Sequence, residues 1–140
     1  MQVRIFSTTA EQILEHAARE HPREACGLLL GRAGTIETAV ATANLAADPE
    51  IAFEIDPAAL LRAHRGARDG GPALLGWYHS HPNGHPEPSP VDAARAEEDG
   101  KLWLIATDRL RLFVSGPGPL HGRFTEVPLA SIAASVARAR

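Results

Sequence analysis

The segment WYHSHPNGHPEPSPVD, residues 77–92, restricts the fold of this chain more than any other stretch. It contains four prolines and three histidines, so it cannot continue as one helix or one strand. The apolar run ALLGWYHSH before the prolines, at 73–81, predicts a strand that is buried at its start and polar at its end. The residues after them, SPVDAARAEEDG at 89–100, predict a short helix with Ser89 as N-cap and Pro90 in its first turn.

The remaining sequence alternates between short strands and helices. We expect strands at 2–6, 24–32, 35–44, 53–55, 101–107, 109–115 and 122–129, with 24–32 and 35–44 forming a hairpin. We expect helices at 8–21, capped by Thr8 or Thr9, from Pro57 to Gly70, capped by Asp56, and at 129–140. This order predicts one α/β domain over 1–140, with a mixed sheet flanked by helices and largely antiparallel toward its C-terminal end.

Composition excludes several classes of protein. A length of 140 residues with 44% hydrophobic and 22% charged residues is normal for one globular domain. Cys26 is the single cysteine, so a disulfide framework is excluded, and neither a signal peptide nor a membrane-spanning run is recognisable. We therefore expect a cytoplasmic protein that binds no membrane. The net charge of −3 and the single lysine, Lys101, argue against nucleic-acid binding.

Two histidines at alternate positions suggest a metal site. His79 and His81 point to the same side of a strand, and two imidazoles there are suitable zinc ligands. Asp92, in the first turn of the next helix, could supply a third ligand and leave a fourth position open for water. A plainer interpretation exists for each part. Paired histidines are often surface or core residues, and SPVD is also a helix capping box, with Ser89 as the cap.

Hydrolysis at such a site needs a group that accepts and delivers a proton. Zinc lowers the pKa of its bound water from 15.7 to about 7. Glu24 is the candidate base, because a lone acid at the start of a buried strand is out of place unless it has a task or a partner. Glu24 could also be a solvated residue preceding the strand. Ser89 could donate its hydroxyl to the oxyanion formed at a carbonyl.

The other histidines and the cysteine are weaker candidates. His85 could be an additional ligand, but turn residues surround it. For Cys26 a small buried thiol is favoured over a nucleophile. We expect the imidazoles of the remaining histidines to lie at the surface: His16, His21, His64 and His121.

The joint pattern HSHPNGHPEPSPVD, with PREACGLLLG upstream, resembles the JAMM (MPN-plus) zinc metallopeptidase family. It fits H-[ST]-H-P-x6-S-x-x-D at every fixed position, and FEIDP and the C-terminal strands are similar to the short bacterial members. The resemblance implies a single MPN-like domain of the cytidine-deaminase-like class. It also implies that His79, His81 and Asp92 bind Zn²⁺, that Glu24 is the catalytic acid/base, and that Ser89 stabilises the oxyanion.

The resemblance further implies hydrolysis of an amide or isopeptide bond after the C-terminal Gly-Gly of a ubiquitin-like protein. Among the short bacterial members, the chain resembles the sulfur-carrier-protein–cysteine hydrolases, so a β-grasp sulfur carrier is the expected partner. A non-catalytic MPN scaffold that binds a ubiquitin-like partner is the alternative. A RadC-like protein is less favoured because Ser80 stands where those proteins have Asn, and a nucleobase deaminase because P-C-x-x-C is absent. Divalent ions other than zinc would also fit. The segment 129–140 could pack on its own sheet or form a homodimer.

Overall fold

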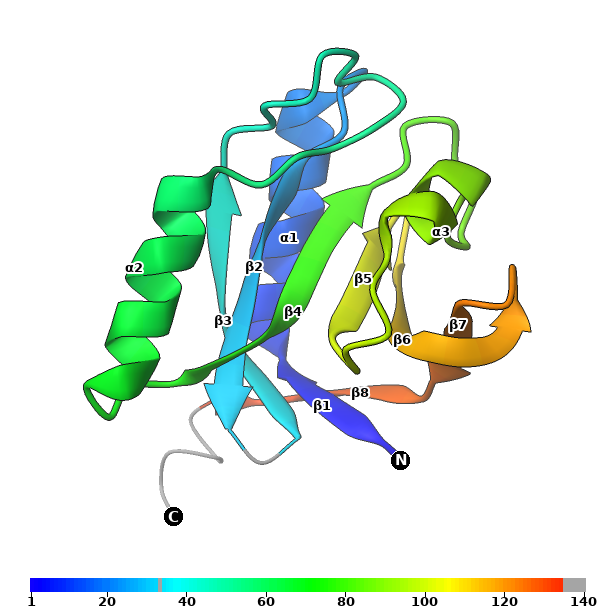
Figure 1. Cartoon of the computed structure of the whole chain (residues 1–140). Helices are drawn as coiled ribbons and strands as arrows, with labels where there is room; N and C mark the ends of the chain where they lie inside the picture. The colour runs from blue at the N-terminus through cyan, green and yellow to red at the C-terminus, as the bar shows by residue number, and fades with distance from the viewer. Residues whose placement is uncertain (33, 135–140) are drawn as a thin grey trace.

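One β-sheet organises the described residues, which are 1–32 and 34–134 of the computed structural model. The strands are β1 (Val3–Phe6), β2 (Cys26–Arg32), β3 (Thr35–Thr42), β4 (Ala73–Ser80), β5 (Leu102–Ala106), β6 (Leu110–Leu120), β7 (Phe124–Val127) and β8 (Leu129–Ile132). The helices are α1 (Ser7–Glu20), α2 (Pro57–Arg68) and α3 (Pro90–Arg95). The strand order is β7-β6-β5-β4-β2-β3-β1-β8 (Figure 1).

The sheet is mixed, as predicted. β2 forms an antiparallel hairpin with β3, and its other edge pairs antiparallel with β4. β5, β6 and β7 continue antiparallel, while β4 pairs parallel with β5 and β1 pairs parallel with β3 and β8. The predicted α/β domain and its hairpin at β2–β3 are confirmed.

The two outer strands of the sheet, β7 and β8, are separated in sequence by Pro128 alone. The Pro128 carbonyl accepts a 3.0 Å hydrogen bond from the backbone N–H of Val3 at the start of β1. The chain thus passes from one edge of the sheet to the other within one residue, and the sheet must curl for this to happen. Val3 and Val127, from opposite ends of the strand order, consequently belong to the same buried apolar cluster.

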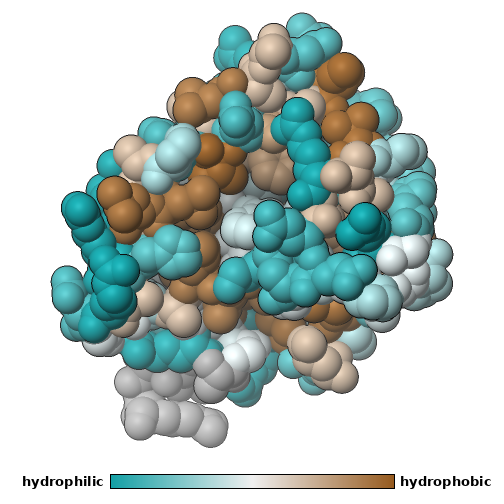
Figure 2. All heavy atoms as spheres, in the orientation of Figure 1, coloured by the Kyte–Doolittle hydropathy of each residue, from teal (hydrophilic) through white to brown (hydrophobic). Residues whose placement is uncertain are grey.

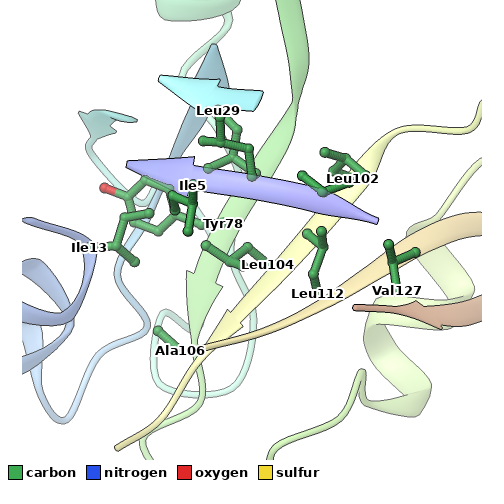
Figure 3. Packing of buried hydrophobic residues seen from close by; sticks show 11 residues of the cluster. Ile5, Ile13, Leu29, Tyr78, Leu102, Leu104, Ala106, Leu112 and Val127 are labelled. Atoms are coloured by element: carbon green, nitrogen blue, oxygen red, sulfur yellow. The ribbon is translucent and has the colours of Figure 1, made fainter. Parts of the chain in front are cut away.

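Helices cover both faces of the sheet; in the view of Figure 1, α1 lies behind β2 and β4, and α2 lies to the left of the strands. Ile13 of α1 belongs to the apolar cluster that contains Leu29, Tyr78 and Leu104 (Figure 3). The opposite face carries one cluster under α2, around Leu28, Ala59 and Leu74, and another under α3, around Ala93, Trp103 and Phe113. Each large apolar side chain buried in this way stabilises the fold by about 1.5–3 kcal/mol.

The helix predicted at 129–140 is wrong over its first part. Leu129–Ile132 form strand β8, which pairs parallel with β1 from Val3↔Leu129 to Phe6↔Ile132. Residues 135–140 lie outside the described part of the chain. The small and apolar residues at 129–132 fit either state, and pairing with a strand at the other end of the sequence decides it.

The strand predicted at 53–55 is also wrong, because the pairing there is limited to one bridge between Asn44 and Ile55. The Asn44 side chain holds this segment instead, since its Oδ1 accepts the N–H of Glu54 and its Nδ2 donates to the Ala52 carbonyl. Side-chain bonds of this kind compete with a strand ladder.

The caps were predicted correctly for two of the three helices found within residues 1–32 and 34–134. Asp56 accepts the N–H of Ala58 at the start of α2 and Ser89 that of Asp92 at the start of α3. Neither Thr8 nor Thr9 caps α1, which begins directly after β1 with Phe6 at the N-cap. The Thr9 hydroxyl donates to the Glu37 carbonyl of β3 instead.

Hydrophilic and hydrophobic residues are mixed over the face of the molecule that Figure 2 shows. In the described part of the chain, no helix has the length and apolar character needed to cross a membrane. The large hydrophobic side chains that are exposed are Met1, Val40, Leu45, Ile51, Leu61 and Val91. Two of them, Ile51 and Val91, form part of the walls of a cleft beyond the end of β4.

Candidate metal centre

Three elements meet where β4 ends. β2 and β4 are antiparallel neighbours with Cys26 opposite His79, so the residues that precede β2 lie beside those at the end of β4. Ser80 points to the other side of the sheet, where its Oγ accepts the Ala25 N–H. The loop after β4 then returns α3 to the same place. Glu24, His79, His81 and Asp92 are all buried there, with exposed fractions of 5%, 0%, 6% and 3%.

Asp92 and the two imidazoles form a compact triangle of ligand atoms. Asp92 Oδ2 lies 3.1 Å from the Nε2 atom of His79 and 3.1 Å from that of His81. The two Nε2 atoms are 3.0 Å apart. A tetrahedral ion with bonds of about 2.0–2.1 Å holds its nitrogen and oxygen ligands roughly 3.3 Å from one another. A small divalent cation could therefore bind between these three atoms with only a slight displacement of the side chains.

Glu24 extends the cluster. One of its carboxylate oxygens and one ring nitrogen each of His79 and His81 all lie within 4.8 Å of one another. Glu24 Oε1 is buried, and no described residue forms a hydrogen bond with it. Burial raises the pKa of Glu24 to about 7. A carboxylate with a pKa near neutrality can both accept and release a proton under physiological conditions.

The pKa of Asp92 is shifted in the opposite direction. Burial alone would raise it, but the imidazoles of His79 and His81 and the Ser89 N–H hold it well below its usual range. Burial lowers the pKa of His79. For His81 the effect of burial is overcome by its hydrogen bonds to Asp92 and to the His85 carbonyl, so its pKa is raised. Asp92 is thus the ionised carboxylate of the cluster.

Each histidine is held by a different environment. His81 Nδ1 lies 2.7 Å from the His85 carbonyl oxygen, to which it donates. His79 stacks on the Phe53 ring at a centroid distance of 4.2 Å and meets Trp103 edge-on at 5.8 Å. Its buried Nδ1 finds no hydrogen-bond partner in the described ranges. Aromatic packing thus positions the imidazole of His79, and a hydrogen bond to the backbone positions that of His81.

Ser89 is joined to Asp92 by a capping box. The Ser89 N–H donates to Asp92 Oδ2 at 2.9 Å, and the Asp92 N–H donates to Ser89 Oγ at 3.0 Å. The cap uses the Ser89 hydroxyl as an acceptor, so its O–H remains available as a donor.

A cleft of about 290 Å³ opens over these groups. Its walls include Glu24, His81 and Ser89 together with Glu50, Ile51, Pro82, Asn83, His85 and Val91. A separate cavity of about 240 Å³, on the α1 side of the β4 end, shares only His81 and Pro82 with the cleft. Glu24 and Ser89 line the cleft, and neither lines the other cavity.

Several residues around the site were not predicted from sequence. Asn44 Nδ2 donates to the Glu24 carbonyl at 3.0 Å and so fixes the segment that carries the acid. Phe53 and Trp103 enclose His79. For Asn44, the sequence offered one signal, an asparagine at the end of a predicted strand. For Phe53 and Trp103 it offered none, because aromatic residues in apolar runs predict only that the side chains are buried.

The other histidines and the cysteine lie in surroundings that indicate a structural role or a surface position. His85 contributes its carbonyl to His81, and Cys26 is a buried thiol whose pKa is raised by burial, as expected for a packing residue. His21, His64 and His121 are exposed as predicted. The prediction for His16 was wrong, because it is buried and its Nδ1 lies 2.8 Å from the Tyr78 hydroxyl.

Comparison with known proteins places this site in a family. Residues 7–116 match the family described as prokaryotic homologues of the JAB domain. The desampylase of Haloferax volcanii is 37% identical over 103 residues, which are 69% of this chain and 74% of that protein. A probable TtuB-protein conjugate cleaving protease of Thermus thermophilus is 36% identical over 108 residues, or 77% of this chain and 72% of that protein.

Proteins with lower sequence identity are also similar to this chain. The CysO-cysteine peptidase of Mycobacterium tuberculosis is 29% identical over 99 residues, 69% of this chain and 67% of that protein. The solution structure of protein DSY2949 from Desulfitobacterium hafniense matches with a TM-score of 0.78 and 29% identity over 94% of both chains. A JAB1/MPN domain protein from Archaeoglobus fulgidus shares the fold, with a TM-score of 0.56 and 19% identity over 92% of this chain and 97% of that one.

The chain belongs to the prokaryotic JAB/MPN (JAMM) family. The relatives of this chain include peptidases, and the buried His79, His81 and Glu24 cluster is a site where a metal ion could bind.

Proposed function

We propose that this protein is a zinc-dependent metallopeptidase that hydrolyses an amide bond after the C-terminal Gly-Gly of a ubiquitin-like or sulfur-carrier protein. The observation that carries the proposal is the convergence of buried His79, His81, Asp92 and Glu24 beside a cleft that is lined by two of them, Glu24 and His81. Two carboxyl groups and two imidazoles are costly to bury together, whereas a bound cation compensates the charge of a carboxylate and accepts the lone pairs of neutral imidazoles.

The two carboxylates take different roles in this proposal. Asp92 is the third ligand beside His79 and His81, because its Oδ2 is the oxygen in contact with both Nε2 atoms and its pKa is depressed. Glu24 lies farther out, lines the cleft and has a pKa near 7. Zinc fits two imidazoles and one carboxylate with an open fourth position, although other divalent ions accept the same donors.

Hydrolysis then depends on what the side chains do around the scissile bond. When bound, the metal supplies Lewis acidity toward the carbonyl and lowers the pKa of the water nucleophile. Glu24 accepts the proton that this water loses and delivers it to the leaving nitrogen. The Ser89 O–H, free of the capping interaction, donates to the oxygen that becomes negative as the carbonyl is attacked.

The relatives suggest the class of substrate. One is described as cleaving TtuB–protein conjugates and another as acting on CysO-cysteine. We therefore propose that the substrate is the tail of a β-grasp carrier joined either to another protein or to a single added cysteine. A Gly-Gly end suits a narrow cleft, because glycine brings no side chain past the walls.

The decisive experiment offers the zinc-loaded protein two substrates built on one Gly-Gly-ending sulfur carrier. One carries a C-terminal cysteine, and the other is joined by its terminal carboxyl to a lysine of a second protein. Mass spectrometry should show release of the intact carrier ending in Gly-Gly, and chelation should abolish it. A protein that binds zinc and leaves both substrates whole would contradict the proposed substrate class. Failure to bind metal would favour the non-catalytic scaffold.

A further inference from the structure

The loop from Pro82 to Pro88, which joins β4 to α3, contains a tight turn beside His81. The Gly84 N–H donates a 2.9 Å hydrogen bond to the His81 carbonyl, closing a four-residue turn with Pro82 and Asn83 in its centre. Gly84 has φ +80°, a conformation that favours glycine. Proline followed by asparagine and glycine is a typical turn sequence. The turn reverses the chain directly beyond a proposed metal ligand.

The Asn83 side chain orients the backbone just beyond this turn. Its Oδ1 accepts the His85 N–H at 2.9 Å, two residues further on. An asparagine side chain that bonds in this way acts as an additional turn of backbone. This hydrogen bond holds the Gly84–His85 peptide, and the carbonyl oxygen of the next peptide, His85–Pro86, lies 2.7 Å from His81 Nδ1. The asparagine itself is exposed, whereas the histidine that it supports is buried.

The direction of the His81–His85 hydrogen bond determines which ring nitrogen is free. A carbonyl oxygen only accepts, so the hydrogen resides on Nδ1. In neutral His81 the lone pair is then on Nε2, the atom that lies 3.1 Å from Asp92 Oδ2 and 3.0 Å from His79 Nε2. Histidines that ligate metals are generally oriented by an acceptor at their other nitrogen.

We propose that Asn83 is a positioning residue for His81, which it orients through the backbone carbonyl of His85. This inference rests on the proposed metal site and adds to it a residue that does not touch the ion. Pro82 and Pro86 limit the conformations of the loop but do not supply the acceptor. The hydrogen bond from the His85 N–H to Asn83 Oδ1 fixes the backbone that leads into His85, the residue whose carbonyl faces His81.

Zinc affinity, measured by competition with a chromophoric chelator, tests the proposal without reference to activity. Asn83→Ala should weaken zinc binding about tenfold, the lower range for loss of a group that orients a ligand. Asn83→Asp retains the acceptor oxygen, and Asn83→Ser offers a neutral one, so both should recover part or all of the affinity. The melting temperature of the metal-free protein should not change, because Asn83 is exposed.

The matched control is Asp108→Ala, in the turn between β5 and β6. Asp108 is also exposed and also accepts a local hydrogen bond, from Thr107 Oγ1 at 3.2 Å, and its substitution should leave zinc affinity unchanged. Unaltered affinity in Asn83→Ala, or equal losses in the Ala, Asp and Ser variants, would overturn the positioning role. Absence of zinc binding in the unsubstituted protein would instead overturn the proposed function, so the two failures are distinguishable.

Discussion

Ser89 and Asp92 cap each other, and the same Asp92 oxygen that accepts the Ser89 N–H faces the two imidazoles. The capping interpretation and the metal-site interpretation of SPVD are therefore compatible. The helix start holds the Asp92 carboxylate in place, and under the proposed function a side chain that is already ordered would lose little entropy on binding a cation.

Substitution of Ser89 should separate its two roles. Ser89→Ala removes both the cap and the donor, so we expect a loss of about 1 kcal/mol in stability and of about 10²–10³-fold in kcat. Ser89→Asp preserves an N-cap acceptor, so it should retain most of the stability but remain inactive. Chemical denaturation and single-turnover kinetics on the two variants provide the comparison. Full activity in Ser89→Ala would exclude the oxyanion role.

Glu24→Gln tests the division of labour between the carboxylates. Gln keeps the shape of the side chain but cannot accept a proton, so kcat should fall about 10²–10⁴-fold. One metal ion per chain should remain bound, as measured by elemental analysis after dialysis. Asp92→Asn is the matched control and should lose the metal. If Glu24→Gln loses the ion while Asp92→Asn keeps it, Glu24 is the third ligand and the two roles are exchanged.

The raised pKa of Glu24 also predicts how the stability of the metal-free protein changes with pH. Its pKa is about 7 in the folded state against an ordinary value of 4.5, mainly because of burial. Between these values the folded state binds more protons than the unfolded state, so the free energy of unfolding falls as pH rises from 4.5 to 7. The contribution of Glu24 to this fall is on the order of 3 kcal/mol.

Denaturant titrations in the presence of chelator, at several pH values from 4.5 to 8, measure this effect. Glu24→Gln should lack the contribution, so its stability relative to the unsubstituted protein should increase across the interval. This range lies above the ordinary pKa of Asp92, whose depressed pKa acts on stability only under more acidic conditions. A constant difference between the two proteins would show that the Glu24 carboxyl is not buried in the folded state.

His85 should be dispensable for metal binding in spite of its place in the motif-containing loop. Its carbonyl rather than its imidazole contacts His81, so His85→Ala should change zinc affinity by no more than about twofold. His81→Ala removes a ligand and should weaken binding at least about a hundredfold. Isothermal titration with zinc compares the two. A large loss in His85→Ala would mean that its imidazole enters the coordination sphere.

The sequence predicted the parts of the site that are close together in the chain. Alternation placed His79 and His81 on one side of a strand, and the residues of SPVD identified the helix that carries Asp92. Both predictions rest on residues that are close together in the sequence, and the local structure agrees with them. The position of Glu24 beside His81 required the family resemblance, because periodicity alone does not state that β2 and β4 are neighbours.

The errors of prediction share a physical cause. Leu129–Ile132 form a strand because they pair with the edge of β1. At 53–55 side chains bind the backbone instead, since Asn44 Oδ1 accepts the Glu54 N–H and Arg95 donates to the Phe53 carbonyl. In both cases the partner is distant or is a side chain, and neither leaves a pattern in the segment itself. His16 was misplaced for the same reason, since its partner Tyr78 lies on another element.

The pairing of β1 with β8 has a consequence for the order of events during synthesis. Val3 leaves the ribosome early, but its partner Leu129 is added only after every residue of the candidate site. At roughly 5–20 residues per second, His79, His81 and Asp92 precede the closing strand by several seconds. Throughout that interval these residues have been synthesised while β8 has not. Among the described strands, β8 is therefore the last to join the sheet, and β1 lacks this neighbour until Leu129–Ile132 have been synthesised.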